Sequence, residues 1–203
     1  MTELSDQAWL EANLNPVLGR QQTGIAIPDL PPEDGQMRFT ARHGRDNLQQ
    51  AFDFYKVVLD HLPTQNKGQF RLIDFGGGWG RVLRLFLRET PADELVLVDC
   101  MTDAVACAQS LHPPFSVLQN APAPPLPSDI TSADCCYAFS VFSHLSEAAC
   151  RGWLRCVSDV LVPGGKLIFT TRGTRQIQYL RQLAPEAPMR VRLPHPDKIL
   201  RRY

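Results

Sequence analysis

The most constraining feature of the chain is an apolar segment that runs into a cluster of glycines and then into a helical pattern. Residues 70–75 read Phe-Arg-Leu-Ile-Asp-Phe, residues 76–80 read Gly-Gly-Gly-Trp-Gly, and apolar residues recur at helical spacing over 80–89. We expect a buried strand, a tight turn and a helix, because glycine lets a backbone bend sharply and lets a ligand approach closely. The free N–H groups at the start of such a helix favour an anionic group.

Apolar strands and amphipathic helices alternate around this turn. An apolar stripe from Leu48 to Leu62 predicts a helix that ends before Pro63. Further strands are expected at 94–98, 115–118, 133–139 and 166–171, and further helices at 103–110 and 146–161. Such alternation with continuously apolar strands is typical of a parallel sheet covered on both faces. We therefore predict an α/β fold, a Rossmann-like three-layer sandwich with five strands in a mostly parallel central sheet.

The two ends of the chain differ from this central part. Pro31, Pro32 and Gly35 interrupt any periodic pattern near the start, which predicts an irregular arm laid over the domain. Residues 172–203 hold seven Arg and one Lys against two acidic residues, with a helix expected at 174–183 and a short strand at 189–193. The predicted organisation is an N-terminal arm (1–45), a cofactor-binding core (46–173) and a basic tail (174–203).

Charge, hydropathy and cysteine usage exclude several classes of protein. The 203 residues carry 21 basic and 21 acidic side chains, and this zero balance argues against binding duplex nucleic acid by bulk electrostatics. No apolar run approaches the roughly 18 residues that span a bilayer, and the first residues lack a secretory signal. The six cysteines form no C-x-x-C pair. We predict a cytoplasmic protein with reduced core thiols, no metal site and no membrane association.

Two kinds of cofactor use a glycine turn of this type. The third glycine of a dinucleotide fingerprint, G-x-G-x-x-G, would fall on Arg81 when counted from Gly78. The pattern present is instead D-x-G-x-G-x-G, from Asp74 to Gly80, followed by Asp99 at the end of the second strand. An acid at that place can hold two ribose hydroxyls, and Asp74 can accept bonds from an ammonium group directly or through water.

Four segments in this order resemble the class I S-adenosylmethionine (SAM)-dependent methyltransferases that act on small molecules. They are the glycine motif at 74–80, the second strand at 95–99, the fourth strand and its loop at 134–145, and the turn into the fifth strand at 160–169. The resemblance spans about residues 68–173. It implies SAM as the cofactor, with S-adenosylhomocysteine as its product, and a small-molecule substrate.

The resemblance also implies a set of cofactor-binding residues at the ends of the first four strands. They are Asp74, Gly76, Gly78, Gly80, Asp99, Cys100, Met101, Asn120, Phe139 and Ser140. The glycines would pass the methionine part of SAM, with Asp74 near its amino group, while Asp99 would hold the ribose. Residues 100 and 101 would lie beside the adenine or ribose, and Asn120 would contact the adenine. The carbonyl of Phe139 would accept from the ammonium, and residue 140 would lead toward the substrate.

His144 is the candidate catalytic residue, because it follows the fourth strand at the carboxyl edge, where such sheets bind ligands. A histidine with a near-neutral pKa can take a proton from a hydroxyl or an amine. The same residues also suit an ordered start of the next helix, so both interpretations stand. Arg42 and His43 precede the helix that begins near residue 46, and could close over the carboxylate of the cofactor.

The family's sheet has seven strands, whereas this chain has room for about one strand after the fifth. We therefore expect a shortened C-terminal end with an exposed sheet edge, where a partner or a second copy of the chain could pair. The leading hypothesis is methyl transfer from SAM to a small-molecule or sugar-type acceptor by in-line displacement. The alternative is a non-catalytic partner protein that keeps the fold and the cofactor. A nicotinamide oxidoreductase is disfavoured by Arg81.

Overall fold

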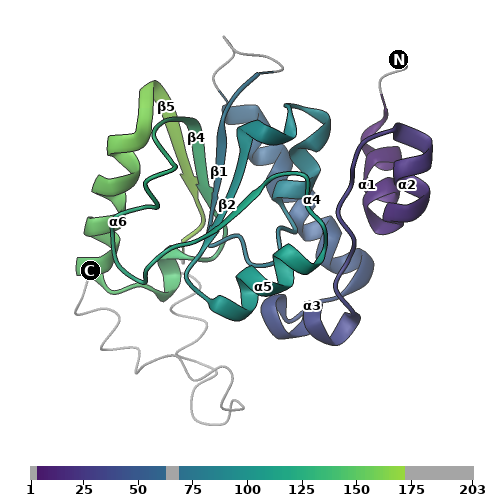
Figure 1. Cartoon of the computed structure of the whole chain (residues 1–203), viewed down its shortest axis with the longest axis horizontal. Coiled ribbons are helices and arrows are strands. Elements are labelled where there is room, and N and C mark those ends of the chain that lie inside the picture. The colour runs from purple at the N-terminus through teal and green to yellow at the C-terminus, as the bar shows by residue number, and fades with distance from the viewer. Residues whose placement is uncertain (1–3, 63–68, 172–203) are drawn as a thin grey trace.

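The computed structural model describes residues 4–62 and 69–171, and in these ranges the chain forms an α/β fold around one sheet (Figure 1). The five strands of the described sheet are β1 (Leu72–Phe75), β2 (Leu95–Asp99), β3 (Ser116–Gln119), β4 (Ala133–Ala138) and β5 (Leu161–Phe169). Their order is β3-β2-β1-β4-β5, and every neighbouring pair is parallel. The predicted Rossmann-like sheet is thereby confirmed, and its carboxyl ends lie along one edge.

Two clusters of buried side chains, one on each face, make the sheet the middle of three layers. Successive side chains of β1 point to opposite faces of the sheet, so that Leu72 belongs to one cluster and Ile73 to the other. Helix α6 (Glu147–Val160) covers the second cluster with Trp153. The first cluster is covered by α4 (Gly44–His61) and by the 3₁₀ segment η2 (Leu83–Arg88). Helix α5 (Thr102–Ser110) packs beside β2 and β3, and two short 3₁₀ turns, η3 (Ala92–Glu94) and η4 (Phe142–His144), complete the described core.

Most element boundaries follow the sequence pattern. Helix α4 ends at His61, as the following proline predicts, and the side chain of Ser146 caps α6 by accepting from the N–H of Ala149 at 3.3 Å. Strand β5 begins five residues earlier than predicted. The Pro163-Gly164-Gly165 segment is part of it, with a register shift against β4 and a positive φ of 84° at Gly164, so it is an irregular stretch of strand.

The predicted helix over 80–89 is wrong in type. The segment forms turns and then the 3₁₀ helix η2, in which Leu85 N–H donates to the Val82 carbonyl at 3.0 Å. The periodic pattern suggested one buried face, but residues 81–86 are all buried. They lie between the sheet and the N-terminal arm, so every side of the segment packs against other residues. The spacing of its apolar residues therefore does not show which type of helix it forms.

The prediction of an irregular N-terminal arm is also wrong. The arm contains α1 (Asp6–Leu14), α2 (Pro16–Thr23) and α3 (Glu33–Thr40). Local signals account for the first two helices. Ser5 and Asn15 cap them with their side chains, a proline opens α2, and Gly24 ends it in the left-handed conformation. The prolines at 28, 31 and 32 lie in the connection between α2 and α3, and Gly35 lies in the first turn of α3 without interrupting it.

The arm is attached to the core by a buried arginine and a buried tryptophan. Trp9 of α1 donates its indole N–H to the Leu85 carbonyl at 2.9 Å. Arg84 is 1% exposed and donates to Asn13 Oδ1 at 3.0 Å and to the carbonyls of Pro28 and Asp29 at 2.5 and 3.2 Å. Burial lowers the pKa of Arg84 to about 9. The arm thus supplies the acceptors that a buried guanidinium requires.

Some of the features predicted from the sequence involve residues that the structure does not describe. The tail helix at 174–183, the strand at 189–193 and the shortened C-terminal end lie outside the described residues, and the three-part domain division stays a prediction. None of the helices within 4–62 and 69–171 has the length and apolar character that a membrane span requires. All six cysteines are free thiols, but Cys100 is exposed, contrary to the expectation that all of them are core residues.

Replacing Arg84 by Met should lower the free energy of unfolding by about 3 kcal/mol, because the carbonyls of the arm would be left buried without donors. Urea denaturation followed by circular dichroism measures the change. Arg151→Met is the matched control, since Arg151 forms an exposed pair with Glu147 one helical turn away. Equal stabilities for the two variants would contradict the anchoring role of Arg84.

Candidate functional site

The glycine turn lies at the carboxyl edge of the sheet, directly after β1, and is tied to β2. Both Gly76 and Gly77 donate their N–H groups to the Val98 carbonyl, at 2.8 and 3.2 Å. Gly76, Gly78 and Gly80 have φ values of 74°, 59° and 83°, in the left-handed region that glycine adopts readily. The N–H groups of Gly76, Gly77 and Gly78 donate to β2 and that of Gly80 donates to the Gly77 carbonyl, so these four donors are already used within the protein.

The turn is crowded on its inner side and open at its middle. A Cβ on Gly76 would lie 2.4 Å from Val141 Cγ2, and one on Gly77 would lie 2.8 Å from Asp74 Oδ2. A Cβ on Gly78 would meet nothing within 4 Å. The glycines at 76 and 77 are therefore required by the protein's own packing, whereas the one at 78 borders free space.

Asp99 connects the turn to the loop that follows β2. Its Oδ2 accepts from Gly78 N–H at 2.9 Å and its Oδ1 accepts from Met101 N–H at 2.9 Å. The residue is 7% exposed. A carboxylate has about four lone-pair positions, so two acceptor positions remain after these bonds. This placement suits the predicted contact with two hydroxyl groups.

Asn120 lies beside the same strand end. Its N–H donates to the Asp99 carbonyl at 3.1 Å, its side-chain amide donates to the Ala121 carbonyl at 2.7 Å, and its buried Oδ1 has no hydrogen-bond partner. The ends of β1, β2 and β3 are thus brought together as the sequence predicts. The exposed residues Cys100 and Met101 adjoin this group, the latter with 51% of its surface exposed.

Asp74 is a buried carboxyl group under the glycine turn. It is 2% exposed, and its Oδ2 has no hydrogen-bond partner. Burial raises the pKa of Asp74 to about 7, and the charge of Asp99 adds to the increase, while the Tyr137 hydroxyl and the Arg81 guanidinium oppose it. A carboxyl group in this state gains most from a cationic partner.

Arg81 is a site residue that the sequence reasoning missed, since it was considered only as a departure from the dinucleotide fingerprint. Its Nη1 donates to Asn47 Oδ1 and Gln50 Oε1 of α4 at 3.1 and 3.0 Å. Its guanidinium carbon lies 4.7 Å from the centroid of the Phe139 ring. Burial lowers the pKa of Arg81 to about 10. The residue joins α4 to the end of β4 at the edge of the site.

The loop after β4 carries the remaining predicted residues. Ser140 has a φ of 64°, unusual outside glycine, and its N–H donates to Thr170 Oγ1 at 2.7 Å. His144 is exposed in η4, and its N–H donates to the Val141 carbonyl at 2.9 Å. Phe139 and Ser140 directly follow β4, whereas His144 lies further along the loop, so its catalytic role stays a prediction.

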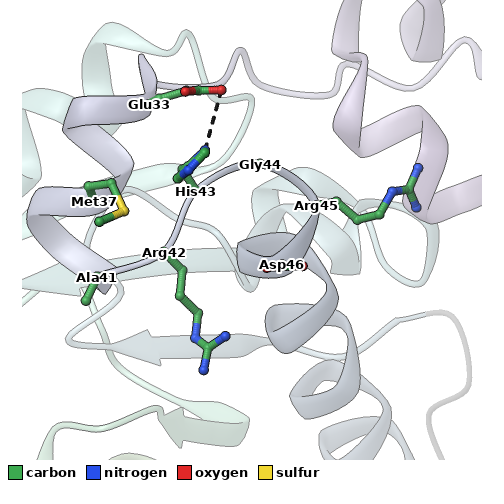
Figure 2. A pocket seen from close by; sticks show the side chains of 8 residues that line it. All are labelled: Glu33, Met37, Ala41, Arg42, His43, Gly44, Arg45 and Asp46. Atoms are coloured by element: carbon green, nitrogen blue, oxygen red, sulfur yellow. Dashed lines mark ion pairs between the residues drawn. The ribbon is translucent and has the colours of Figure 1, made fainter.

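Arg42 and His43 line an open hollow of about 740 Å³ between α3 and α4 (Figure 2). His43 lies 3.4 Å from Glu33 Oε1, and Figure 2 shows the Arg42 side chain extending away from this pair. The charge of Arg42 contributes to lowering the pKa of Arg81, so the two guanidinium groups are electrostatically coupled. The hollow therefore lies close to the cation at the edge of the site.

The strands are parallel in the order β3-β2-β1-β4-β5, a glycine turn follows β1, and an acid ends β2. These features are typical of an α/β domain that binds a nucleoside. Residues 73–167 match the sequence model of a family described as a methyltransferase domain. The match lies within residues 68–173, the part of the chain whose sequence resembles the class I SAM-dependent methyltransferases. A search of curated proteins found no match.

Several solved structures share this fold with the chain. The SAM-bound amino pentose methyltransferase CalS10 from Micromonospora echinaspora is 20% identical, with a TM-score of 0.51 over 62% of this chain and 50% of its own. DesVI from Streptomyces venezuelae is 18% identical, with a TM-score of 0.54 over 71% and 58%. PH0226 from Pyrococcus horikoshii is 16% identical, with a TM-score of 0.54 over 70% and 65%. The chain thus covers about half to two thirds of these proteins, and the likeness establishes the fold.

Gly76→Ala should lower the free energy of unfolding by about 2 kcal/mol or more, because it adds a close contact with Val141 to the cost of a left-handed backbone. Gly78→Ala carries only the backbone cost of about 1 kcal/mol, since nothing lies near its Cβ. Urea denaturation of both variants measures the difference. The packing argument fails if Gly78→Ala is the less stable variant.

Wild-type protein should lose stability relative to Asp74→Asn as pH rises from 4 to 8. The pKa of this carboxyl is higher in the folded state (about 7) than its ordinary value of 3.8, so folding favours the protonated form. Its stabilising contribution is present below pH 4 and is lost as pH rises through 7, by at most about 4 kcal/mol. Urea midpoints at pH 5, 6, 7 and 8 test this, with the exposed Asp93→Asn as control. Parallel curves for wild type and Asp74→Asn would contradict a raised pKa.

Proposed function

We propose that the chain binds SAM at the carboxyl ends of β1, β2 and β3 and transfers its methyl group to a small-molecule acceptor. The observation that carries the proposal is a pair of buried, unpartnered acceptor oxygens on Asp74 and Asn120, with the Asp99 carboxylate between their strands. Buried acceptors without donors are uncommon in proteins, and a ligand that donates to them explains their presence.

The donors of SAM match these acceptors by type. Asp74 would accept from the methionine ammonium group, and the two remaining positions of Asp99 would accept from the ribose hydroxyls. Asn120 Oδ1 would accept from the adenine amino group. The free space at Gly78 would receive the cofactor, with Cys100 and Met101 at the border of the nucleoside. The residues present therefore fit this cofactor.

SAM supplies a methyl group on a sulfonium whose leaving group is neutral, so the protein needs no strong acid. The chain's own residues have to hold the acceptor in line with the methyl carbon and exclude water. Phe139 and Ser140 at the end of β4 suit this positioning role, and His144 would take a proton from an acceptor hydroxyl or amine. We propose the hollow at Arg42 as the side from which the acceptor enters.

The acceptor that we propose is a small, sugar-type molecule. CalS10 is described as an amino pentose methyltransferase, and the shared fold supports, by analogy only, an acceptor of similar size. The free thiols support a cytoplasmic location. We also propose that β5, at one end of the described sheet, offers its edge to a second copy or a partner.

A second candidate function is a non-catalytic partner protein with the same fold. It is favoured by the site itself, because the unpartnered oxygens of Asp74 and Asn120 bear on binding of the cofactor and not on transfer of its methyl group. Methyl transfer to a small molecule separates the two functions.

SAM should raise the melting temperature of the protein and NADH should not. At 100-fold excess over Kd the stabilisation is about 2.7 kcal/mol. Asp99→Ala should lose most of this shift, because the acceptors for the ribose are removed, whereas the exposed control Asp93→Asn should keep it. Differential scanning fluorimetry measures both, and an undiminished shift in Asp99→Ala would remove this residue from the site.

Incubation with SAM and a panel of amino sugars, sugars and small amines should release S-adenosylhomocysteine, detected by mass spectrometry. With an acceptor in hand, His144→Gln should lower kcat by about 100-fold if this residue is the general base, with little change in the Kd of SAM. SAM binding without product from any acceptor would favour the partner function. An unchanged kcat in the variant would exclude His144 as the base.

A further inference from the structure

Tyr137 is a buried tyrosine beside Asp74 that the proposed function has not yet used. In the parallel ladder between β1 and β4, Asp74 pairs in register with Tyr137, so both side chains project from the same face of the sheet. Tyr137 is 0% exposed, and its hydroxyl has no hydrogen-bond partner. Its ring packs against Phe54 and Phe86 at centroid distances of 5.8 Å, which holds it in place.

An unpartnered donor and an unpartnered acceptor therefore lie next to each other in the core. Because the two side chains are register partners, each acts on the other: the hydroxyl lowers the pKa of Asp74, and the carboxyl adds to the increase that burial causes in the pKa of Tyr137. The carboxyl also lies directly under the turn, since a Cβ on Gly77 would be 2.8 Å from its Oδ2. The Tyr137–Asp74 pair thus occupies the floor of the proposed ammonium site.

The charged and titratable groups that face Asp74 come from three elements. Asp99 of β2 disfavours a second negative charge, whereas the Tyr137 hydroxyl of β4 favours the carboxylate. Arg81 favours the carboxylate, but its hydrogen bonds go to Asn47 and Gln50 of α4. In the described parts of the chain, no cation therefore bonds to Oδ2, and the buried carboxyl is largely protonated below its raised pKa of about 7.

We propose that the Tyr137 hydroxyl positions the Asp74 carboxylate for the ammonium group of the cofactor, so that cofactor binding expels a proton from this pair. This inference rests on the proposed function. Before binding, Asp74 carries the proton in about half of the molecules at pH 7 and in more of them at lower pH. When the ammonium arrives, the O–H bond of the carboxylic acid breaks, the proton leaves to solvent, and the carboxylate accepts from the ammonium and from the Tyr137 hydroxyl.

The pH dependence of SAM affinity separates this role from a structural one. In Tyr137→Phe the ring is kept but the group that favours the carboxylate is lost, so SAM should bind more weakly. The ratio of the variant's Kd to that of wild type should be largest at pH 6 and fall as pH rises to 8.5. The titration of the SAM amino group cancels in this ratio. Tyr55→Phe is the matched control, a buried tyrosine whose hydroxyl bonds to Glu89, and its ratio should not depend on pH.

Isothermal titration calorimetry of wild type in buffers of different ionisation enthalpy gives a second measurement that does not require the variant to fold. At pH 7 about half a proton should be released for each SAM bound, and none in Asp74→Asn. A flat Kd ratio in folded Tyr137→Phe, or no proton release in wild type that binds SAM, would overturn the inference.

The failure of the proposed function would look different. Wild type that binds no SAM at any pH refutes SAM binding and with it the role of Tyr137 toward the cofactor. The pH dependence of unfolding of Tyr137→Phe without ligand still reports on the pair. Loss of the hydroxyl should shift to higher pH the range over which ionisation of Asp74 lowers the free energy of unfolding. If stability depends on pH in the same way in the variant and in wild type, the hydroxyl does not act on Asp74.

Discussion

The bonds that the glycine turn makes with the end of β2 are the constraint on which the rest of the site depends. The Val98 carbonyl accepts two N–H groups of the turn and the Asp99 carboxylate accepts a third. The same carboxylate holds the N–H of Met101 and so sets the path into α5. One acid thus fixes the relative positions of two loops, and two of its acceptor positions remain for a ligand.

Three charged side chains are buried at or near the site. Asp74, Arg81 and Arg84 are all buried, and each has a different solution to the cost of desolvation. Arg84 is surrounded by carbonyl and amide oxygens of the arm, and Arg81 by side chains of α4 and the face of an aromatic ring. The Oδ2 atom of Asp74 has no such polar or aromatic partner, and burial raises the pKa of this carboxyl instead. The group whose solvation is incomplete is the one that lies at the cofactor turn.

The sequence predicted the sheet, and it predicted which candidate site residues lie at its carboxyl edge, because both depend on local patterns. Apolar runs, a glycine cluster and an acid at a strand end are visible without knowledge of the fold. The type of η2 and the helices of the arm were mispredicted, since residues 81–86 are buried by a segment about seventy positions away. Tyr137 was overlooked for a related reason. A hydroxyl in an apolar strand becomes informative only when the register places it beside Asp74.

The dependence of Arg84 on Asn13, Pro28 and Asp29 bears on where the autonomous folding unit begins. A division at residue 46 follows the change in sequence pattern, but it separates a guanidinium from its acceptors and Trp9 from the hydrophobic core. The minimal independently stable unit therefore includes the first three helices. Arg84 follows the glycine turn by four residues, so deletion of those helices would remove the acceptors of a buried charge next to that turn.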